Sequence, residues 1–302
     1  MPDDNLTYPY GWPSVSPSGE MTLDAFLSDP KRVTRAIARL ALQKFYVDKI
    51  FTGAGDITGG SVVYDQATGN ELYAARDVGR VEPGDEFPIV TFERGAPKTA
   101  QVEKFGGKFP VTDEARRRNQ QGRVNRAILQ LANTIARKTQ ARALLELTAA
   151  ITEHARTAVG TNWVTAAGTI AGNRVPTVGP LADLTMVERS NEVAELGYDY
   201  DFAIMNPNQW RDFRLAAGGT SQDARELLAD SGINDVWVTN RKSAGSVLWL
   251  AQRQVGEIGY EVPLSTEQWR DKDGKQKDWF QSYVLPIVYV TDPYAILETT
   301  GH

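Results

Sequence analysis

The sequence has no cysteine and only two histidines, His154 and His302, among its 302 residues. The lack of cysteine excludes disulfide frameworks, cysteine-ligated zinc, iron–sulfur clusters and thiol nucleophiles. His302 is the final residue, and chain ends are usually mobile, so a histidine-based catalytic or metal site would depend on His154 alone. The composition therefore argues against most enzymes, and we expect no catalytic residue, no metal and no cofactor.

Long apolar runs are also lacking. The longest strongly apolar stretch, Tyr283 to Val290, has eight residues and includes a proline, whereas a membrane-spanning helix needs about 20 residues. The first twenty residues contain no lysine or arginine, so they do not resemble a secretory signal peptide. We therefore expect no membrane partner and synthesis in a cytoplasm.

The charge of the chain is unevenly distributed. There are 33 basic and 38 acidic residues, a formal net charge of −5, so the average charge does not indicate nucleic-acid binding. Residues 54–98 carry four basic and eight acidic residues, a net −4, whereas residues 113–157 carry nine basic and four acidic residues, a net +5. This segregation is typical of surfaces that meet neighbouring molecules.

The N-terminal third is predicted to contain little regular structure of its own. Residues 1–30 read as an extended arm, because prolines occur throughout, and its rings (Tyr8, Tyr10 and Trp12) are candidate inter-subunit contacts. Residues 31–50 have a helical pattern. Residues 54–98 read as a protruding acidic hairpin with strands at 61–64, 71–73 and 87–92. Isolated hairpins are marginally stable in water, so we expect a neighbouring molecule to support this one.

A long basic helix follows a strand predicted over residues 101–111. Thr112 is a candidate N-cap, and apolar residues recur at helical spacing up to Ile151. About 45 helical residues would span on the order of 65 Å. Clustered arginines fit a solvated helix face, contact with phosphates or contact with an acidic protein; the candidate basic face comprises Arg116, Arg117, Arg118, Arg123 and Arg126.

The remainder mixes helices and strands, which gives an α+β fold class. Helices are predicted over 181–196 and from Pro207 to Leu215, the second with Asn206 as its N-cap. Strands are predicted over 201–205, 236–238, 246–250 and 294–297, together with a long hairpin formed by 257–269 and 279–291.

Motifs for ligand chemistry fail on inspection. The glycines of residues 53–59 are misplaced for a dinucleotide fingerprint, so a loop is the better interpretation. Residues 95–99 carry proline where a phosphate loop needs glycine. Residues 271–275 place Lys275 where a calcium loop needs an oxygen ligand. Asp199 and Asp201 alternate at a strand entrance and converge with nothing else.

The order of these elements resembles the major capsid protein of tailed double-stranded DNA phages, the Hong Kong 97 phage-like fold that bacterial encapsulin shells also use. The resemblance is carried by the strands at 61–64 and 87–92, by residues 109–114 leading into the long helix, and by the strand, turn and helix of residues 202–210. No single motif is diagnostic, so the likeness lies in order and spacing over nearly the whole chain.

The resemblance implies a division of the chain into named parts. These are an N-terminal arm (1–30), a P-domain (31–53, 99–162 with the spine helix, and the return strands of 255–302), an E-loop (54–98) and an α/β A-domain (163–254). Asn70, Glu71, Tyr73 and Arg76 are then candidate contacts at the tip of the E-loop. The function implied is structural: pentamers and hexamers of the chain form an icosahedral virion capsid in the bacterial host cytoplasm.

Partners also follow from the resemblance. The chain would bind itself and, non-specifically, the packaged double-stranded DNA, and the resemblance allows a separate scaffolding protein, a portal and a decoration protein. An encapsulin-type compartment enclosing protein cargo is the alternative of the same fold. A monomeric hydrolase or sugar-binding protein is the alternative of a different class.

Two properties of the family are tested against these residues. Some members cross-link their shells through a lysine of the E-loop, but residues 54–97 contain no lysine, so we expect no such cross-link. Some members carry a cleaved scaffold domain of about a hundred residues before the first helix. Only some thirty residues precede that helix here, so we expect that scaffolding, if there is any, comes from a separate chain.

Overall fold

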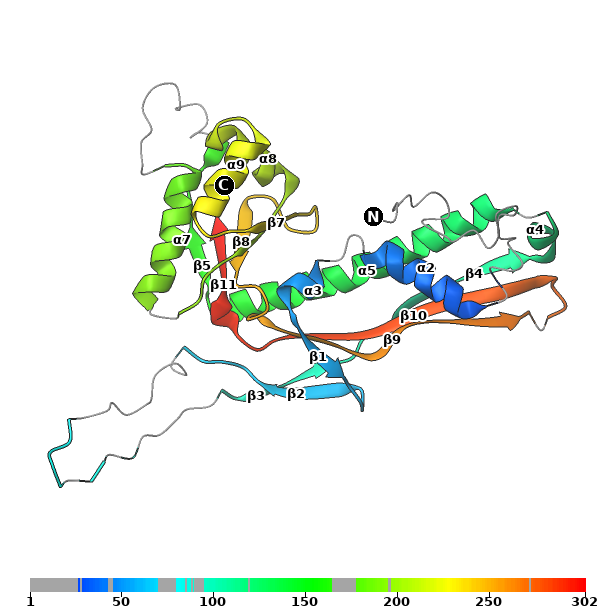
Figure 1. Ribbon diagram of the computed structural model, residues 1–302, viewed down its shortest axis with the longest axis horizontal. Helices are drawn as coiled ribbons and strands as arrows, with labels where there is room; N and C mark the ends of the chain where they lie inside the picture. The colour runs from blue at the N-terminus through cyan, green and yellow to red at the C-terminus, as the bar shows by residue number, and fades with distance from the viewer. Residues whose placement is uncertain are drawn as a thin grey trace, which may run out of the picture.

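The structure, a computed structural model, describes residues 27, 29–42, 46–69, 80–84, 86–87, 89, 95–118, 120–164, 178–194, 197–271 and 273–302. Figure 1 shows an elongated molecule with a long helix and a long β-hairpin running side by side, an α/β region at one end and a protrusion below it. None of the helices in the described ranges is long and apolar enough to cross a membrane.

A four-stranded sheet and two helices form the elongated part. The strand order is β1-β9-β10-β4, and β9 and β10 form the long antiparallel hairpin. The helices α2 and α5 cover one face of this sheet, where Phe109, Phe280 and Val284 pack against Ile37 and Ile128. The elements are α2 (Pro30–Leu42), β1 (Thr52–Asp56), β4 (Phe105–Thr112), α5 (Gln121–Glu153), β9 (Gly256–Arg270) and β10 (Lys277–Val290).

The α/β region contains a five-stranded sheet with the order β5-β11-β8-β6-β7. All four residues of β6 and all five of β8 are buried, as expected for strands covered on both faces. The elements are β5 (Thr157–Val159), α7 (Pro180–Ala194), β6 (Phe202–Met205), α8 (Pro207–Ala217), α9 (Ser221–Asp230), β7 (Asp235–Val238), β8 (Ser246–Leu250), η1 (Pro293–Ala295) and β11 (Ile296–Thr300).

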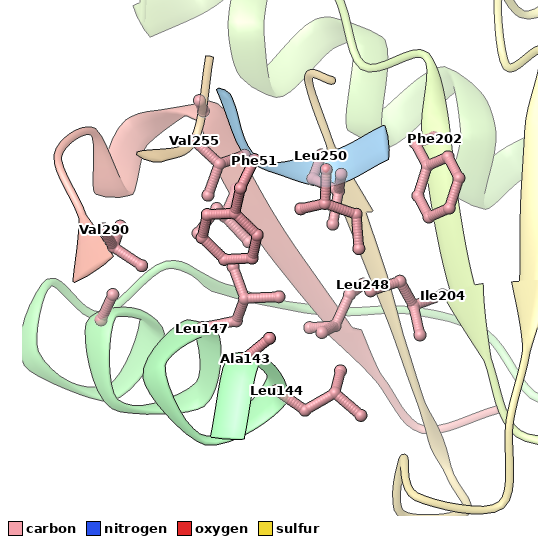
Figure 2. Packing of buried hydrophobic residues seen from close by; sticks show 14 of the residues in the cluster. Phe51, Ala143, Leu144, Leu147, Phe202, Ile204, Leu248, Leu250, Val255 and Val290 are labelled. Atoms are coloured by element: carbon pink, nitrogen blue, oxygen red, sulfur yellow. The ribbon is translucent and has the colours of Figure 1, made fainter. Parts of the chain in front are cut away.

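Alternate residues of β6 point to two different hydrophobic cores. Ala203 and Met205 join the core formed with α7, α8 and α9. Phe202 and Ile204 join the core formed with α5 and with the short helix α3 (Val47–Ile50), as Figure 2 shows. The long helix therefore belongs to two cores, because its first half packs against the four-stranded sheet and its second half against the α/β region.

The protrusion begins with a two-stranded antiparallel ribbon, β2 (Ser61–Asp65) paired with β3 (Pro97–Gln101). Its apolar contacts are confined to its base, where Val62 and Tyr64 lie near Ile287 and Tyr289. The Tyr64 and Tyr289 rings lie 4.7 Å apart. The ribbon alone therefore has no core of its own.

Several predicted local structures are confirmed. The side chain of Thr112 caps the following helix by accepting a hydrogen bond from the Ala115 amide. The side chain of Asn206 accepts from the Asn208 amide, and Pro207 occupies the first turn of α8. The strand at 246–250 and the long hairpin are also confirmed.

The prediction of one unbroken basic helix is wrong. The structure has a short helix, α4 (Asp113–Arg117), whose C-cap is Arg118, and the long helix α5 begins only at Gln121. The helix then ends at Glu153, so that Thr157–Val159 can pair with β11. With 33 residues, α5 spans about 50 Å.

Other boundaries also differ from the predictions. The predicted helix over 31–50 is two helices, α2 and α3. Residues 52–56, interpreted as part of a glycine-rich loop, form strand β1, which pairs in parallel with β9. The helix α9 was not predicted, although Thr220 caps it by accepting from the Asp223 amide.

Candidate assembly surfaces

The five arginines of the predicted basic face fall into two groups. Arg116 is held inside the fold, because its guanidinium lies 2.9 Å from Asp278, whose side chain is 7% exposed. Arg270 donates to both carboxylate oxygens of Asp113 at 2.5 and 2.6 Å. This hydrogen bonding holds the pKa of Asp113 below its ordinary value. The start of the helical segment is therefore fastened to the β9–β10 hairpin.

The other four, Arg117, Arg118, Arg123 and Arg126, are exposed. No carboxylate among the described residues forms an ion pair with them. Residues 115–145 contain no aspartate or glutamate, so the only acidic residues within four sequence positions of these arginines are Asp113 and Glu114, which precede Arg117 and Arg118. Together they form a basic surface along α4 and the first turns of α5.

Further cations extend this basic surface toward the α/β region. Arg137 and Lys138 are exposed on α5, and Arg241 follows β7. The guanidinium of Arg241 donates to the side-chain oxygen of Gln140. Burial, and then the nearby charge of Arg137, lower the pKa of Arg241. Like charges are thus held close together at the middle of the long helix.

The protruding loop exposes both acidic and apolar side chains. Glu82 and Glu86 are exposed, and Phe87 and Ile89 have exposed fractions of 80% and 77%. Phe87 and Ile89 lie outside any strand, so the predicted strand over 87–92 is not found at the positions that the structure describes. The predicted tip residues Asn70, Glu71, Tyr73 and Arg76, and the arm residues Tyr8, Tyr10 and Trp12, lie outside the described residues.

The base of the loop is fixed to the body by polar contacts. The buried side chain of Gln66 donates to the Val290 carbonyl oxygen at 3.1 Å, and its own oxygen lies 3.2 Å from Nε2 of His154. Lys98 lies 2.5 Å from the Glu153 carboxylate. This hydrogen bond lowers the pKa of Glu153. A Cβ at Gly95 would overlap the Gln66 carbonyl oxygen. The outgoing and the returning backbone segments of the loop therefore approach each other closely at this point.

The expectation of a mobile His302 is wrong. Its side chain is fully buried in the α/β region, with Nδ1 3.3 Å from the Asp183 carboxylate and its ring stacked 4.1 Å from that of Trp163. Asp183 also accepts from Nε1 of Trp163 at 2.6 Å and from Thr161. This cluster ties the end of the chain to α7, and within the described ranges no three histidine, aspartate or glutamate side chains are grouped so as to hold a metal ion.

The comparison with known families decides what these surfaces belong to. The profile of a family described as phage capsid protein matches residues 95–299, which is more than half of the chain. The chain belongs to the phage capsid protein family. Among curated proteins, none matches the sequence. The predictions of a structural, non-enzymatic role and of a place in the virion capsid are thereby confirmed.

Solved structures agree on the fold. A virus-like particle from Pyrococcus furiosus has a TM-score of 0.62 at 11% identity, covering 89% of this chain and 98% of its own. The capsid of cyanophage P-SCSP1u has a TM-score of 0.55 at 13% identity, covering 85% and 88%. A structure from Microbacterium phage Oxtober96 has a TM-score of 0.54 at 14% identity, covering 86% and 90%. The likeness shows a mixed α+β, Hong Kong 97 phage-like capsid fold.

The surfaces described above are therefore those of a phage major capsid protein, whose copies assemble into the icosahedral shell of the virion. A shell protein acts through contacts between copies, so its functional sites are exposed patches and protrusions rather than a cleft. For this capsid protein the candidate surfaces are the basic surface on α4 and α5 and the acidic, apolar loop.

Proposed function

We propose that this capsid protein assembles as hexamers and pentamers and that the closed shell encloses double-stranded DNA. The observation that carries the proposal is the protrusion that begins with β2 and β3: its described residues have apolar packing only at its base, and Phe87 and Ile89 are exposed. A segment with exposed apolar residues and no core gains order by lying on a neighbour. Repetition of one such heterologous contact around a rotation axis closes a ring.

We assign the roles of the segments on the same basis. The four-stranded sheet with α2 and α5 corresponds to a P-domain, the protrusion to an E-loop, and residues 163–254, whose strands form a sheet with β5 and β11, to an A-domain. Residues 1–30 act as an arm that reaches a neighbouring subunit. Scaffolding, portal and decoration proteins are further partners consistent with this role.

The basic surface of α4 and α5 is proposed to face the packaged DNA. Phosphates are bound non-specifically by arginines that lack an acidic partner, and Arg117, Arg118, Arg123 and Arg126 meet this condition among the described residues. Arg116 contributes less, because Asp278 already pairs with it. The interior of a shell thus gains positive charge although the chain as a whole carries a net charge of −5.

The decisive experiment on function is expression of the full chain, followed by electron microscopy and assays of the enclosed nucleic acid and protein. Closed shells are the expected result, and particles produced during phage infection should contain DNA. A chain that stays monomeric would contradict the proposal. Shells that enclose a specific protein and no DNA would favour an encapsulin-type compartment, the second candidate.

The role of the basic surface is tested separately. Changing Arg117, Arg118, Arg123 and Arg126 together to glutamine should reduce DNA retention while isolated subunits keep their unfolding midpoint. The matched control changes the exposed Arg189 and Arg225, on α7 and α9, to glutamine. Equal DNA content in the two variants would contradict a DNA-facing role.

A further inference from the structure

The α/β region has an open pocket of about 850 Å³ on its surface, between α7, residues 197–201 and the turn that follows α9. Its floor belongs to a hydrophobic core, because the lining residues Leu184 and Val187 are only 1% and 2% exposed. The Asn234 amide donates to the Asp201 carbonyl oxygen at 2.9 Å, and this hydrogen bond joins two of the walls. The pocket is therefore held in shape before any ligand arrives, and its volume is in the range of small-molecule sites.

Two tyrosine side chains also line the pocket, and both are fixed in place. The hydroxyl of Tyr198 donates to the carboxylate of Asp292, and the hydroxyl of Tyr200 accepts a hydrogen bond from the Arg156 guanidinium at 3.1 Å. Because both hydroxyl groups bind elsewhere in the same chain, the rings add aromatic surface of fixed position to the pocket. A hydrocarbon chain could therefore be buried here with little reordering of the protein.

Four carboxylates accompany this apolar surface: Glu188 and Glu192 on α7, and Asp199 and Asp201 on the segment that follows it. No lysine or arginine is among the described residues that line the pocket, and within the described ranges none forms an ion pair with these four side chains. Asp201 accepts a hydrogen bond from the Gln252 amide at 2.7 Å. The pocket therefore combines uncompensated negative charge with an apolar floor, and a ligand that fits both is an organic cation.

The spacing of the carboxylates indicates a cation with more than one charge. Glu188 and Glu192 are four residues apart on a helix, which places their Cβ atoms about 5–6 Å apart, and like charges at this spacing destabilise a helix. Asp199 and Asp201 are two residues apart on an extended segment, which separates them by about 7 Å. Two ammonium groups joined by three or four methylene groups are about 5–6 Å apart, so a linear polyamine matches this spacing. The four carboxylates do not form a metal site, because no three such side chains are grouped in that way within the described ranges.

We infer that this pocket binds a linear aliphatic polyamine. The ammonium groups pair with the carboxylates, and the methylene chain lies on Leu184, Val187 and the tyrosine rings. The N-terminal arm and the protruding loop of this chain do not fit, because residues 1–30 contain five acidic and no basic residues and residues 54–98 carry a net charge of −4. Every group that the inference uses belongs to one copy of the chain, so binding is independent of the assembly proposed above.

Isothermal titration calorimetry of the full-length protein with spermine tests the inference. The wild type should bind spermine at one site per chain, and the variant with Glu188→Gln and Glu192→Gln should bind it about tenfold more weakly or worse. The matched control carries Glu226→Gln and Asp230→Asn, which removes an exposed acidic pair with the same four-residue spacing on α9, outside the pocket. This control should bind spermine as the wild type does. Butylamine, which has a single ammonium group, should bind the wild type at least tenfold more weakly than spermine.

Thermal unfolding without ligand shows whether each variant is folded, and added spermine should raise the midpoint of the wild type more than that of the Glu188→Gln, Glu192→Gln variant. Absence of spermine binding to the wild type would overturn the inference. Equal losses in the pocket variant and the α9 control, or displacement of spermine by an equal concentration of magnesium chloride, would also overturn it, because both indicate a general attraction between charges. A trilysine peptide that binds more tightly than spermine would assign the pocket to a basic protein segment instead of a polyamine.

Discussion

The α/β region and the protruding loop show two opposite ways in which a segment of the chain is stabilised. In the α/β region, strands β6 and β8 are buried on both faces, and Trp163, Phe213 and Trp249 are fully buried between them and the helices. Among the described residues of the loop, apolar contacts occur only at its base. One part therefore has a core within a single subunit, whereas the other is proposed to gain its stability from neighbouring copies in the shell.

The largest expected effect comes from breaking the core of the α/β region. Trp249→Ala removes a fully buried ring whose Nε1 donates to Thr299 at 2.9 Å, and should lower the free energy of unfolding by about 3–5 kcal/mol. Urea unfolding followed by circular dichroism measures this change. Arg225→Ala, at an exposed position of α9, should change it by less than about 0.5 kcal/mol. A loss below about 1 kcal/mol for Trp249→Ala would argue against a self-sufficient core.

The second prediction tests whether shell assembly depends on the position of the loop, independently of the stability of the subunit. Gly95→Ala places a methyl group against the Gln66 carbonyl, so the base of the loop must move, and shell assembly should be lost. The unfolding midpoint of the isolated subunit should fall only slightly. Assembly is measured by sedimentation and electron microscopy.

Gly122→Ala is the matched control for this change. Nothing lies within 4 Å of the added Cβ at Gly122, which is in the first turn of α5. Alanine in a helix is favoured over glycine by up to about 1 kcal/mol, so this variant should assemble normally and be slightly more stable. Normal assembly of the Gly95→Ala variant would contradict the importance of the loop base.

A third prediction concerns the apolar residues of the loop. Changing Phe87 and Ile89 together to serine should leave the free energy of subunit unfolding within about 0.5 kcal/mol of the wild type, because both side chains are exposed. Shell yield should nevertheless fall severalfold. Val193→Ser on α7, where the valine is 74% exposed, controls for the loss of exposed apolar surface. If the double variant changes the free energy of subunit unfolding and leaves the shell yield unchanged, the apolar residues of the loop pack within their own subunit.

The smallest effect is a dependence of stability on pH. Arg270 holds the pKa of Asp113 below its ordinary value of 3.8, so ionised Asp113 stabilises the folded state. This stabilisation is fully present at pH values above the ordinary pKa of 3.8 and is lost as the pH falls toward the lower pKa of Asp113 in the folded state. Asp113→Asn should therefore be less stable than the wild type at pH 7, and the difference should narrow at pH 3. The urea midpoints of the two proteins at pH 7 and pH 3 measure this difference in stability. A difference that is the same at both pH values would exclude the ion pair between Asp113 and Arg270 as its cause.

The sequence predicts those elements whose signals are local. Asn206 and Pro207 mark the start of α8, and the five apolar residues of β8 mark a buried strand. The break between α4 and α5 has no such signal, because residues 118–120, which separate the two helices, include neither glycine nor proline. The break coincides with long-range contacts instead, since Arg116 pairs with Asp278 on β10.

Long-range contacts also explain the other errors. Residues 52–56 look like a loop because they include two glycines, and they become a strand only by pairing with β9. His302 is buried by partners far away in the sequence, Asp183 and Trp163. The half-exposed face of β10 has no such local signal, because residues 277–284 run in pairs of polar and apolar side chains although their burial alternates along the strand.

The long helix has a geometric consequence for the curvature of the shell. Because α5 belongs to two cores, it behaves as a rigid lever about 50 Å long. Tilting such a lever by about 5° displaces its far end by roughly 4 Å. Five-fold and six-fold rings of the same chain differ in the angle between neighbours. In the hexamers and pentamers proposed above, a small tilt at one end of α5 therefore becomes a shift of several ångströms at the other end.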